Sequence, residues 1–198
     1  MHLIRDVYTR NRIYYYLYTI KSVFFRQLDG VTIRGQLFML IGEALLLCAA
    51  WFLFFKKKNT PIRRIIHYYL LMAYVGFILS VTILRRPLGS REKMMNLYID
   101  IGLGRTGYWL WWCLFITFLN VILFIPWGIL IGPLFRKKGY LKGIFITTAI
   151  GFFTSLMVEC IQYKTGTGFF ELTDLMTNTI GTFIGAVLAL SINRLFRK

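Results

Sequence analysis

Residues 144–163 read IFITTAIGFFTSLMVECIQY, an apolar stretch in which Glu159 is the one charged side chain. A helix rises about 1.5 Å per residue, so about 20 residues cross the roughly 30 Å hydrocarbon layer of a bilayer. The core of a soluble protein does not require an apolar run of this length. The stretch therefore predicts a membrane-spanning helix and indicates that the chain is a membrane protein.

Four further stretches have the length and composition of membrane spans. Each is a long, mainly apolar run. We therefore expect an all-α fold, a polytopic transmembrane helical bundle of about five spans with an amphipathic basic N-terminal segment. In chain order, the predicted spans are roughly Gly35–Phe55, Ile65–Leu84, Trp109–Phe135, Ile144–Tyr163 and Asp174–Asn193.

The N-terminal part of the chain differs from the rest. Residues 1–34 mix tyrosine and phenylalanine with arginine and lysine, and the apolar positions Ile13, Leu17 and Phe24 lie at helical spacing. This pattern predicts a basic, aromatic tail whose helix lies in the lipid headgroup region. Residues 35–64 are expected to form an extra first span and a cytoplasmic loop.

The charge balance is strongly basic, with a net charge of +16. The basic residues lie mostly in loops and tails, where anionic lipid headgroups and the positive-inside bias explain them, so no nucleic-acid partner is expected. Lysine and arginine are densest in Lys56–Arg64, Arg136–Gly143 and Arg194–Lys198. These segments predict one cytoplasmic side, which includes the C-terminus.

Cysteine and histidine are sparse. Cys48, Cys113 and Cys160 lie in apolar stretches without a Cys-x-x-Cys spacing, and His2 and His67 are far apart. Neither residue type shows the spacing of a metal site or of a disulfide framework. We therefore expect no metal and no cofactor.

Two polar pairs stand in the most apolar half of the chain. Glu159 and Gln162 are three residues apart and share one helix face, and Asp174 and Asn178 are four apart and share another. A carboxylate at the centre of a span costs about 2.5–3.5 kcal/mol, so such residues usually face a bundle interior or a cavity. With the ends of the second and third spans, they predict an outer-leaflet polar pocket that binds a ligand. Its predicted residues are Glu159, Gln162, Asp174, Asn178, Asn120, Arg85 and Arg86.

Two Gly-x-x-x-Gly motifs predict close helix packing. One is formed by Gly128 and Gly132 in the third span, and the other by Gly181 and Gly185 in the fifth. Glycine at this spacing lets two helix backbones approach closely in lipid.

Simpler interpretations of the polar residues stay open. Asp174 follows Thr173 and would serve equally well in capping a helix N-terminus. Glu159 lies inside an apolar run and has no cap to form, but a buried hydrogen bond to Gln162 or Asn178 would hold helices together by roughly 1 kcal/mol. The chain has no Gly-x-Ser-x-Gly and no His-Glu-x-x-His motif. Glu159 and Asp174 are therefore the candidate catalytic residues, as general acid and base.

The polar and glycine motifs together resemble the VanZ family of small bacterial membrane proteins. One block is Asn120-Val-Ile-Leu-Phe-Ile-Pro-Trp-Gly128, and the other runs from Glu159-x-x-Gln162 to the Asp174, Asn178 and glycine series. The resemblance makes residues 65–198 the VanZ-like membrane domain and implies a place in the bacterial cytoplasmic membrane.

The founding member of that family confers low-level resistance to teicoplanin, a lipoglycopeptide. The resemblance therefore implies a role in the cell envelope, with membrane lipids and a lipoglycopeptide or a lipid-linked peptidoglycan precursor as binding partners. The alternative is an intramembrane enzyme that acts on a lipid headgroup through its carboxylate pair.

Overall fold

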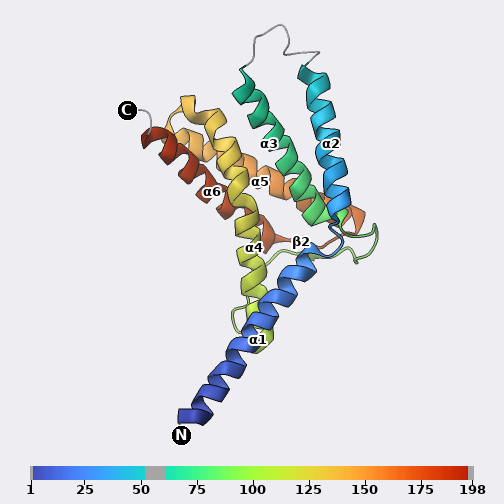
Figure 1. Ribbon diagram of the computed structural model, residues 1–198, viewed down its shortest axis with the longest axis vertical. Helices are drawn as coiled ribbons and strands as arrows, with labels where there is room; N and C mark the ends of the chain where they lie inside the picture. Colours follow the sequence, from blue (N-terminus) through green and yellow to red (C-terminus); the bar gives the residue numbers. More distant parts are fainter. Residues whose placement is uncertain (1, 52–60, 196–198) are drawn as a thin grey trace.

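The computed structural model describes residues 2–51 and 61–195, and helices make up most of this part of the chain (Figure 1). The all-α fold predicted from the sequence is confirmed. The helices are α1 His2–Leu28, α2 Ile33–Ala50, α3 Ile62–Leu79, α4 Gly107–Ile131, α5 Tyr140–Thr165 and α6 Leu172–Leu195.

Four helical segments of the described chain are long and apolar enough to cross a membrane. Two of them include short irregular ends, because α3 continues through a π-helical turn, Ser80–Leu84, and α4 through a 3₁₀ segment, Gly132–Lys138. The described part of the predicted first span, Gly35–Phe55, consists of α2 from Gly35 onward and Trp51, and its remainder lies outside the described residues. The four candidate spans are Ile62–Leu84, Gly107–Lys138, Tyr140–Thr165 and Leu172–Ile192.

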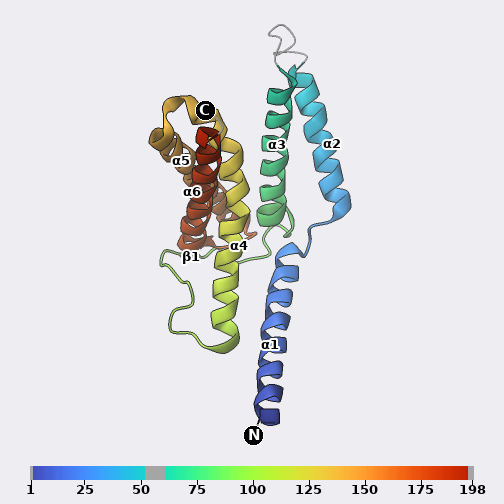
Figure 2. The same cartoon turned by 60° about the vertical axis from the view of Figure 1, so that its left-hand side comes forward.

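The turn between α1 and α2 is set by two small residues. Gly30 has a positive φ of 86°, and a Cβ at this position would overlap the carbonyl oxygen of Arg85. Thr32 then caps α2, because its hydroxyl accepts a hydrogen bond from the backbone N–H of Gly35 at 3.2 Å. Figure 2 shows the result: α1 leaves the bundle alongside the first half of α4, with its last turn beside the end of α3.

Helices α4 and α6 approach closely along a seam of glycines. A Cβ at Gly181 would overlap the carbonyl of Val121, and a Cβ at Gly185 would overlap that of Ile125. The contacts advance together along both helices, so α4 and α6 run in the same direction. Gly128 completes the seam from the side of α4, facing the backbone of Thr182. Backbone-to-backbone packing of this kind is how helices associate in lipid without a hydrophobic driving force.

Helix α5 packs antiparallel to α6 and completes the core. Gly151 of α5 lies against the side chain of Thr182. On one side of these helices, Phe124 of α4 and Val158 of α5 belong to the buried apolar cluster, whereas Phe153 of α5 is 60% exposed. An apolar side chain that faces outward from a helix of membrane-spanning length is expected to face lipid.

Two loops are joined at one end of the bundle, which we call the polar end: it comprises the end of α3, the end of α5, the start of α6 and the loops between them. The two-residue strands β1 (Met95–Asn96) and β2 (Phe170–Glu171) pair in parallel there. The backbone N–H of Arg91 also donates to the carbonyl of Gly166 at 2.8 Å. Gly166 has a positive φ of 63° and ends α5. These backbone bonds hold the loop that follows α3 over the ends of α5 and α6.

Candidate functional site

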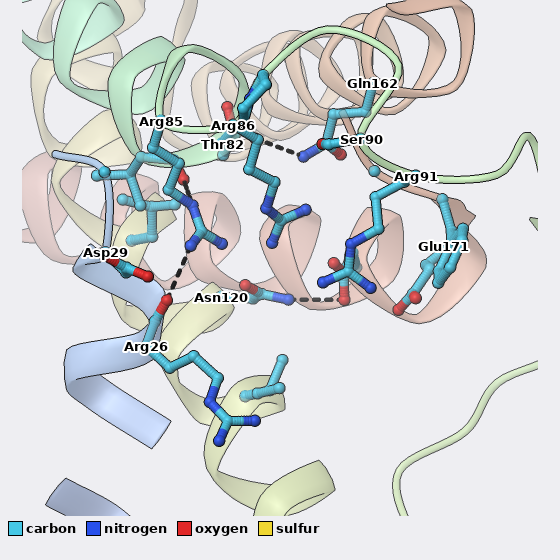
Figure 3. A pocket seen from close by; sticks show the side chains of 18 of the residues that line it. Arg26, Asp29, Thr82, Arg85, Arg86, Ser90, Arg91, Asn120, Gln162 and Glu171 are labelled. Carbon is cyan, nitrogen blue, oxygen red and sulfur yellow. Dashed lines mark hydrogen bonds between the residues drawn. The ribbon is translucent and has the colours of Figure 1, made fainter. Parts of the chain in front are cut away.

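A cavity of about 660 Å³ opens at the polar end, between α1, α3, α4 and the start of α6 (Figure 3). Polar and charged side chains from five segments of the chain line it, together with apolar ones such as Trp112 and Phe169. Its charged and amide residues are Arg26, Asp29, Arg85, Arg86, Arg91, Asn120, Gln162, Glu171 and Asp174.

Asp174 and Asn120 meet across the cavity floor. The side-chain amide of Asn120 donates to Asp174 Oδ1 at 2.7 Å and joins the middle of α4 to the first turn of α6. Helix α6 begins at Leu172, so Asp174 lies inside the first turn. A carboxylate in this turn is stabilised by the helix dipole, and the bond to Asn120 is what directs it toward the cavity.

Gln162 joins α5 to the irregular end of α3. Its Nε2 donates to the carbonyl of Thr82 at 2.8 Å, within the π-helical turn. A π-helical turn changes which backbone carbonyls are bonded within the helix. The bond fixes one wall of the cavity, because Thr82 and Gln162 both line it.

Glu159 and Asn178 lie beneath the cavity and do not line it. Glu159 is 2% exposed, and its Oε2 accepts a hydrogen bond from the backbone N–H of Glu171 at 2.9 Å. Asn178 is 4% exposed and donates to the hydroxyl of Ser155 at 2.9 Å. The predicted ligand-binding residues therefore form two layers. Glu159 and Asn178 form the buried layer. Gln162, Asp174, Asn120, Arg85 and Arg86 form the layer that lines the cavity.

Three arginines line the cavity from the chain that follows the π-helical turn, and Arg91 lies beside Glu171 (Figure 3). Arg85 donates from Nη1 to the carbonyl of Arg26 at 2.9 Å, and Arg86 donates from Nη1 to the carbonyl of Thr167 at 2.9 Å. The guanidinium of Arg91 lies 5.5 Å from the centre of the Phe169 ring. Figure 3 shows the heads of Arg85, Arg86 and Arg91 in the same part of the cavity.

Burial and mutual repulsion act on these cations. Burial, followed by the charges of Arg86 and Arg91, lowers the pKa of Arg85 to about 10. Burial and the charge of Arg91 also lower the pKa of Arg86, while nearby carboxylates oppose this change. Burial raises the pKa of Glu171, and the charge of Arg86 acts in the opposite direction. The site thus holds partly desolvated charges of both signs.

Sequence reasoning missed four of the charged residues that line the cavity: Arg26, Asp29, Arg91 and Glu171. Glu171 had a usable signal, because it stands three residues before Asp174. Arg91 had none in its spacing, since the pairing of two loops brings it to the site. Within the described residues, no group of three or more His, Cys, Asp or Glu side chains is arranged to hold a metal ion.

Comparison with known proteins identifies relatives for most of the chain. The VanZ/LLP1 family model matches residues 43–196. The Protein VanZ of Enterococcus faecium is 38% identical over 69 residues, which cover 35% of this chain and 40% of that protein. The matched stretch thus spans well under half the length of that relative. No solved structure matches the chain.

Proposed function

Because the chain belongs to the VanZ/LLP1 family of proteins, we propose that it is a cell-envelope protein that binds an amphiphilic ligand in the cavity at its polar end. The ligand is a lipid-linked peptidoglycan precursor or a lipoglycopeptide, and binding confers low-level resistance to teicoplanin. The relative named VanZ supports the choice of this antibiotic class.

The proposed setting is the outer leaflet of the bacterial cytoplasmic membrane. At the opposite end of α4 from the cavity, the 3₁₀ segment ends in Arg136, Lys137 and Lys138. Short loops rich in lysine and arginine stay in the cytoplasm, so this end is cytoplasmic. The cavity then opens on the outside, where envelope precursors and glycopeptides are exposed, and the C-terminus lies in the cytoplasm.

The observation that carries the proposal is the mixed composition of the cavity. Asp174 and Glu171 supply acceptors for sugar hydroxyls or amines, Asn120 and Gln162 supply amides, and the arginines supply cationic donors. The ring of Phe169 adds an apolar wall. A ligand pocket typically combines apolar walls with a few convergent polar groups, and this cavity has both.

The test is teicoplanin susceptibility in a bacterial host that expresses the wild-type chain, Asp174→Asn or the matched control Glu92→Gln. Glu92 is exposed and lies outside the cavity lining. We expect wild type and the control to raise the inhibitory concentration, and Asp174→Asn to lose the increase at equal membrane level. No increase on wild-type expression would remove the resistance role.

An intramembrane enzyme is the second candidate, because Asp174 reaches the cavity while held by Asn120. In this alternative Asp174 and Glu159 act as base and acid on a lipid headgroup. The variant Glu159→Gln tests whether Glu159 transfers a proton. The near-isosteric amide keeps an oxygen acceptor for the backbone N–H of Glu171 but cannot act as an acid or a base. Full resistance in this variant would exclude proton transfer at Glu159.

A purely structural role makes a different prediction. If the polar residues only hold helices together, Asp174→Asn lowers folded yield and resistance in the same proportion. Loss of resistance in a stable, well-expressed Asp174→Asn variant would contradict that alternative. Membrane levels therefore have to be measured beside every inhibitory concentration.

A further inference from the structure

The cavity holds more positive groups than the carboxylates around it balance. Four arginines line it against three carboxylates, which are Asp29, Glu171 and Asp174. Glu171 weakens the balance further, because burial favours its neutral form. The cationic wall comes from three separate segments: the last turn of α1, the residues after α3 and the loop that is bonded to the end of α5.

The guanidinium groups of Arg86 and Arg91 use few of their N–H donors within the protein. Arg86 uses Nη1 for the carbonyl of Thr167, and Arg91 stacks near Phe169. Within the described chain, neither of them forms a salt bridge. A guanidinium carries five N–H donors, so Arg86 and Arg91 retain several that can reach a ligand. Because these cations also repel one another, an anion between them would be stabilised by both effects.

The shape of the donor set favours a phosphate over a carboxylate. A carboxylate is planar and is satisfied by one bidentate fork, whereas a phosphate has oxygens in several directions and binds more than one guanidinium. The heads of Arg85, Arg86 and Arg91 approach from the same wall (Figure 3). The cavity volume of about 660 Å³ also leaves room for two linked phosphates.

A second cavity indicates where the rest of the ligand would lie. A groove of about 550 Å³ uses the same two helices as the arginine cavity, and its lining is apolar apart from Glu43 of α2. Val81 of the π-helical turn after α3 and Leu123 of α4 line the arginine cavity, and Leu79 of α3 and Trp127 of α4, each about one turn or less away, line the groove. The two cavities therefore lie about one helical turn apart along the same helices, within reach of a hydrocarbon chain that starts at the arginines.

We propose that the cavity binds the phosphate or pyrophosphate group of a membrane lipid, with the lipid's hydrocarbon chain in the groove between α2, α3 and α4. Arg86 and Arg91 bind the phosphate oxygens directly, and Arg85 holds the end of α1 against the site. This inference rests on the proposed function, since it names the chemical class of the ligand for the same cavity.

The first experiment uses the full chain in nanodiscs of a zwitterionic lipid and three probes: farnesyl pyrophosphate, farnesol and inorganic pyrophosphate. We expect farnesyl pyrophosphate to bind at least about tenfold more tightly than farnesol, since each lost charge-assisted hydrogen bond changes affinity by about that factor. Inorganic pyrophosphate keeps those bonds, but we expect it to bind at least about tenfold more weakly as well, because it buries no apolar surface in the groove. Equal binding of farnesol would overturn the phosphate site. Equal binding of inorganic pyrophosphate would overturn the lipid chain and leave a free phosphate as the ligand.

The second experiment uses variants. Arg86→Gln with Arg91→Gln is expected to weaken farnesyl pyrophosphate binding by about tenfold or more, while Arg64→Gln at the far end of α3 leaves it unchanged. Val75→Trp fills the groove and is expected to weaken farnesyl pyrophosphate but not inorganic pyrophosphate. Unchanged affinity in the folded double arginine variant would overturn the assignment. If that variant does not fold, the wild-type preference among the three probes decides.

Failure of this inference and failure of the proposed function give different results. The binding experiments contain no glycopeptide. If the protein prefers the pyrophosphate lipid but gives no teicoplanin resistance, the phosphate site is supported and the resistance role is excluded. If resistance depends on Asp174 but the protein binds farnesol as tightly as farnesyl pyrophosphate, the proposed function is supported and the phosphate site is excluded.

Discussion

The seam between α4 and α6 and the cavity at the polar end belong to the same two helices, but they are built in opposite ways. At Gly181 and Gly185 the backbone of α6 lies so close to α4 that no side chain fits between them. Toward the start of α6 the helices meet through the hydrogen-bonded side chains of Asn120 and Asp174. The first region excludes every ligand, and the second leaves a cavity open.

This difference separates two roles of polar and small residues in a membrane bundle. Small residues stabilise the bundle because they let two helix backbones pack closely, and they need no hydrogen-bonding partner. Buried carboxylates and cations are costly without a partner, so a cavity that gathers them indicates use rather than stability. Each of the following substitutions alters only one of the two regions, and we expect substitutions in the two regions to have different effects.

The largest effect is expected from Gly185→Leu in the seam. The new side chain would overlap the carbonyl of Ile125, which is backbone and cannot move aside cheaply. Overpacking typically costs about 1–3 kcal/mol and more when the clash is with backbone, so we expect little folded protein after purification in detergent. Gly42→Ala in α2 is the control, because a Cβ there meets nothing within 4 Å. Similar folded yield and thermal stability for the two variants would contradict the close packing of the seam.

The helices could be predicted from the sequence, because hydropathy is a local property of the chain. The partners of the polar residues could not. Glu159 accepts a hydrogen bond from the backbone of Glu171, and Gln162 donates to the backbone of Thr82. A backbone partner leaves no mark in residue identity, so spacing placed Glu159 and Gln162 on one face without showing what each would meet.

The arginine wall was only half visible for the same reason. Arg85 and Arg86 end an apolar span and attract attention. Arg91 joins them because Gly166 and Thr165 bond to the backbone of its loop. Those bonds depend on the course of two loops, and hydrophobic periodicity says nothing about loops.

A moderate effect is expected from Asn120→Leu at the polar end. The change removes the amide that donates to Asp174 and leaves that carboxylate without this partner. A hydrogen bond to a charged group contributes about 1.5–3 kcal/mol, so the free energy of unfolding should fall by about 2 kcal/mol. Asp174→Asn in the same background should recover part of the loss, because a neutral amide costs less to leave unpaired.

The double-mutant cycle gives the control for this prediction. Chemical unfolding in detergent is measured for wild type, Asn120→Leu, Asp174→Asn and the double variant. Directly bonded residues are expected to show a coupling energy of about 0.5–3 kcal/mol. Strictly additive changes in the free energy of unfolding would mean that the hydrogen bond between Asn120 and Asp174 does not stabilise the contact between α4 and α6.

The smallest effect concerns the pH dependence of stability. Burial raises the pKa of Glu171 in the folded protein, and the charges of Arg86 and Arg91 oppose this increase. Between its unfolded pKa of about 4.3 and the raised folded value, the native state binds more protons than the unfolded state. The contribution of Glu171 is therefore fully present below about pH 4.3 and is lost as the pH rises through the folded pKa.

Thermal unfolding of wild type and Glu171→Gln between about pH 4 and pH 8 tests this sign. We expect the stability of wild type to decrease over this range relative to the variant, which does not titrate. Arg86→Gln should widen the range, since it removes a charge that holds the pKa of Glu171 down. Identical pH profiles for wild type and Arg86→Gln would contradict an electrostatic interaction between Arg86 and Glu171. The arginines and carboxylates of the cavity would then be as independent of one another as both are of the glycine seam.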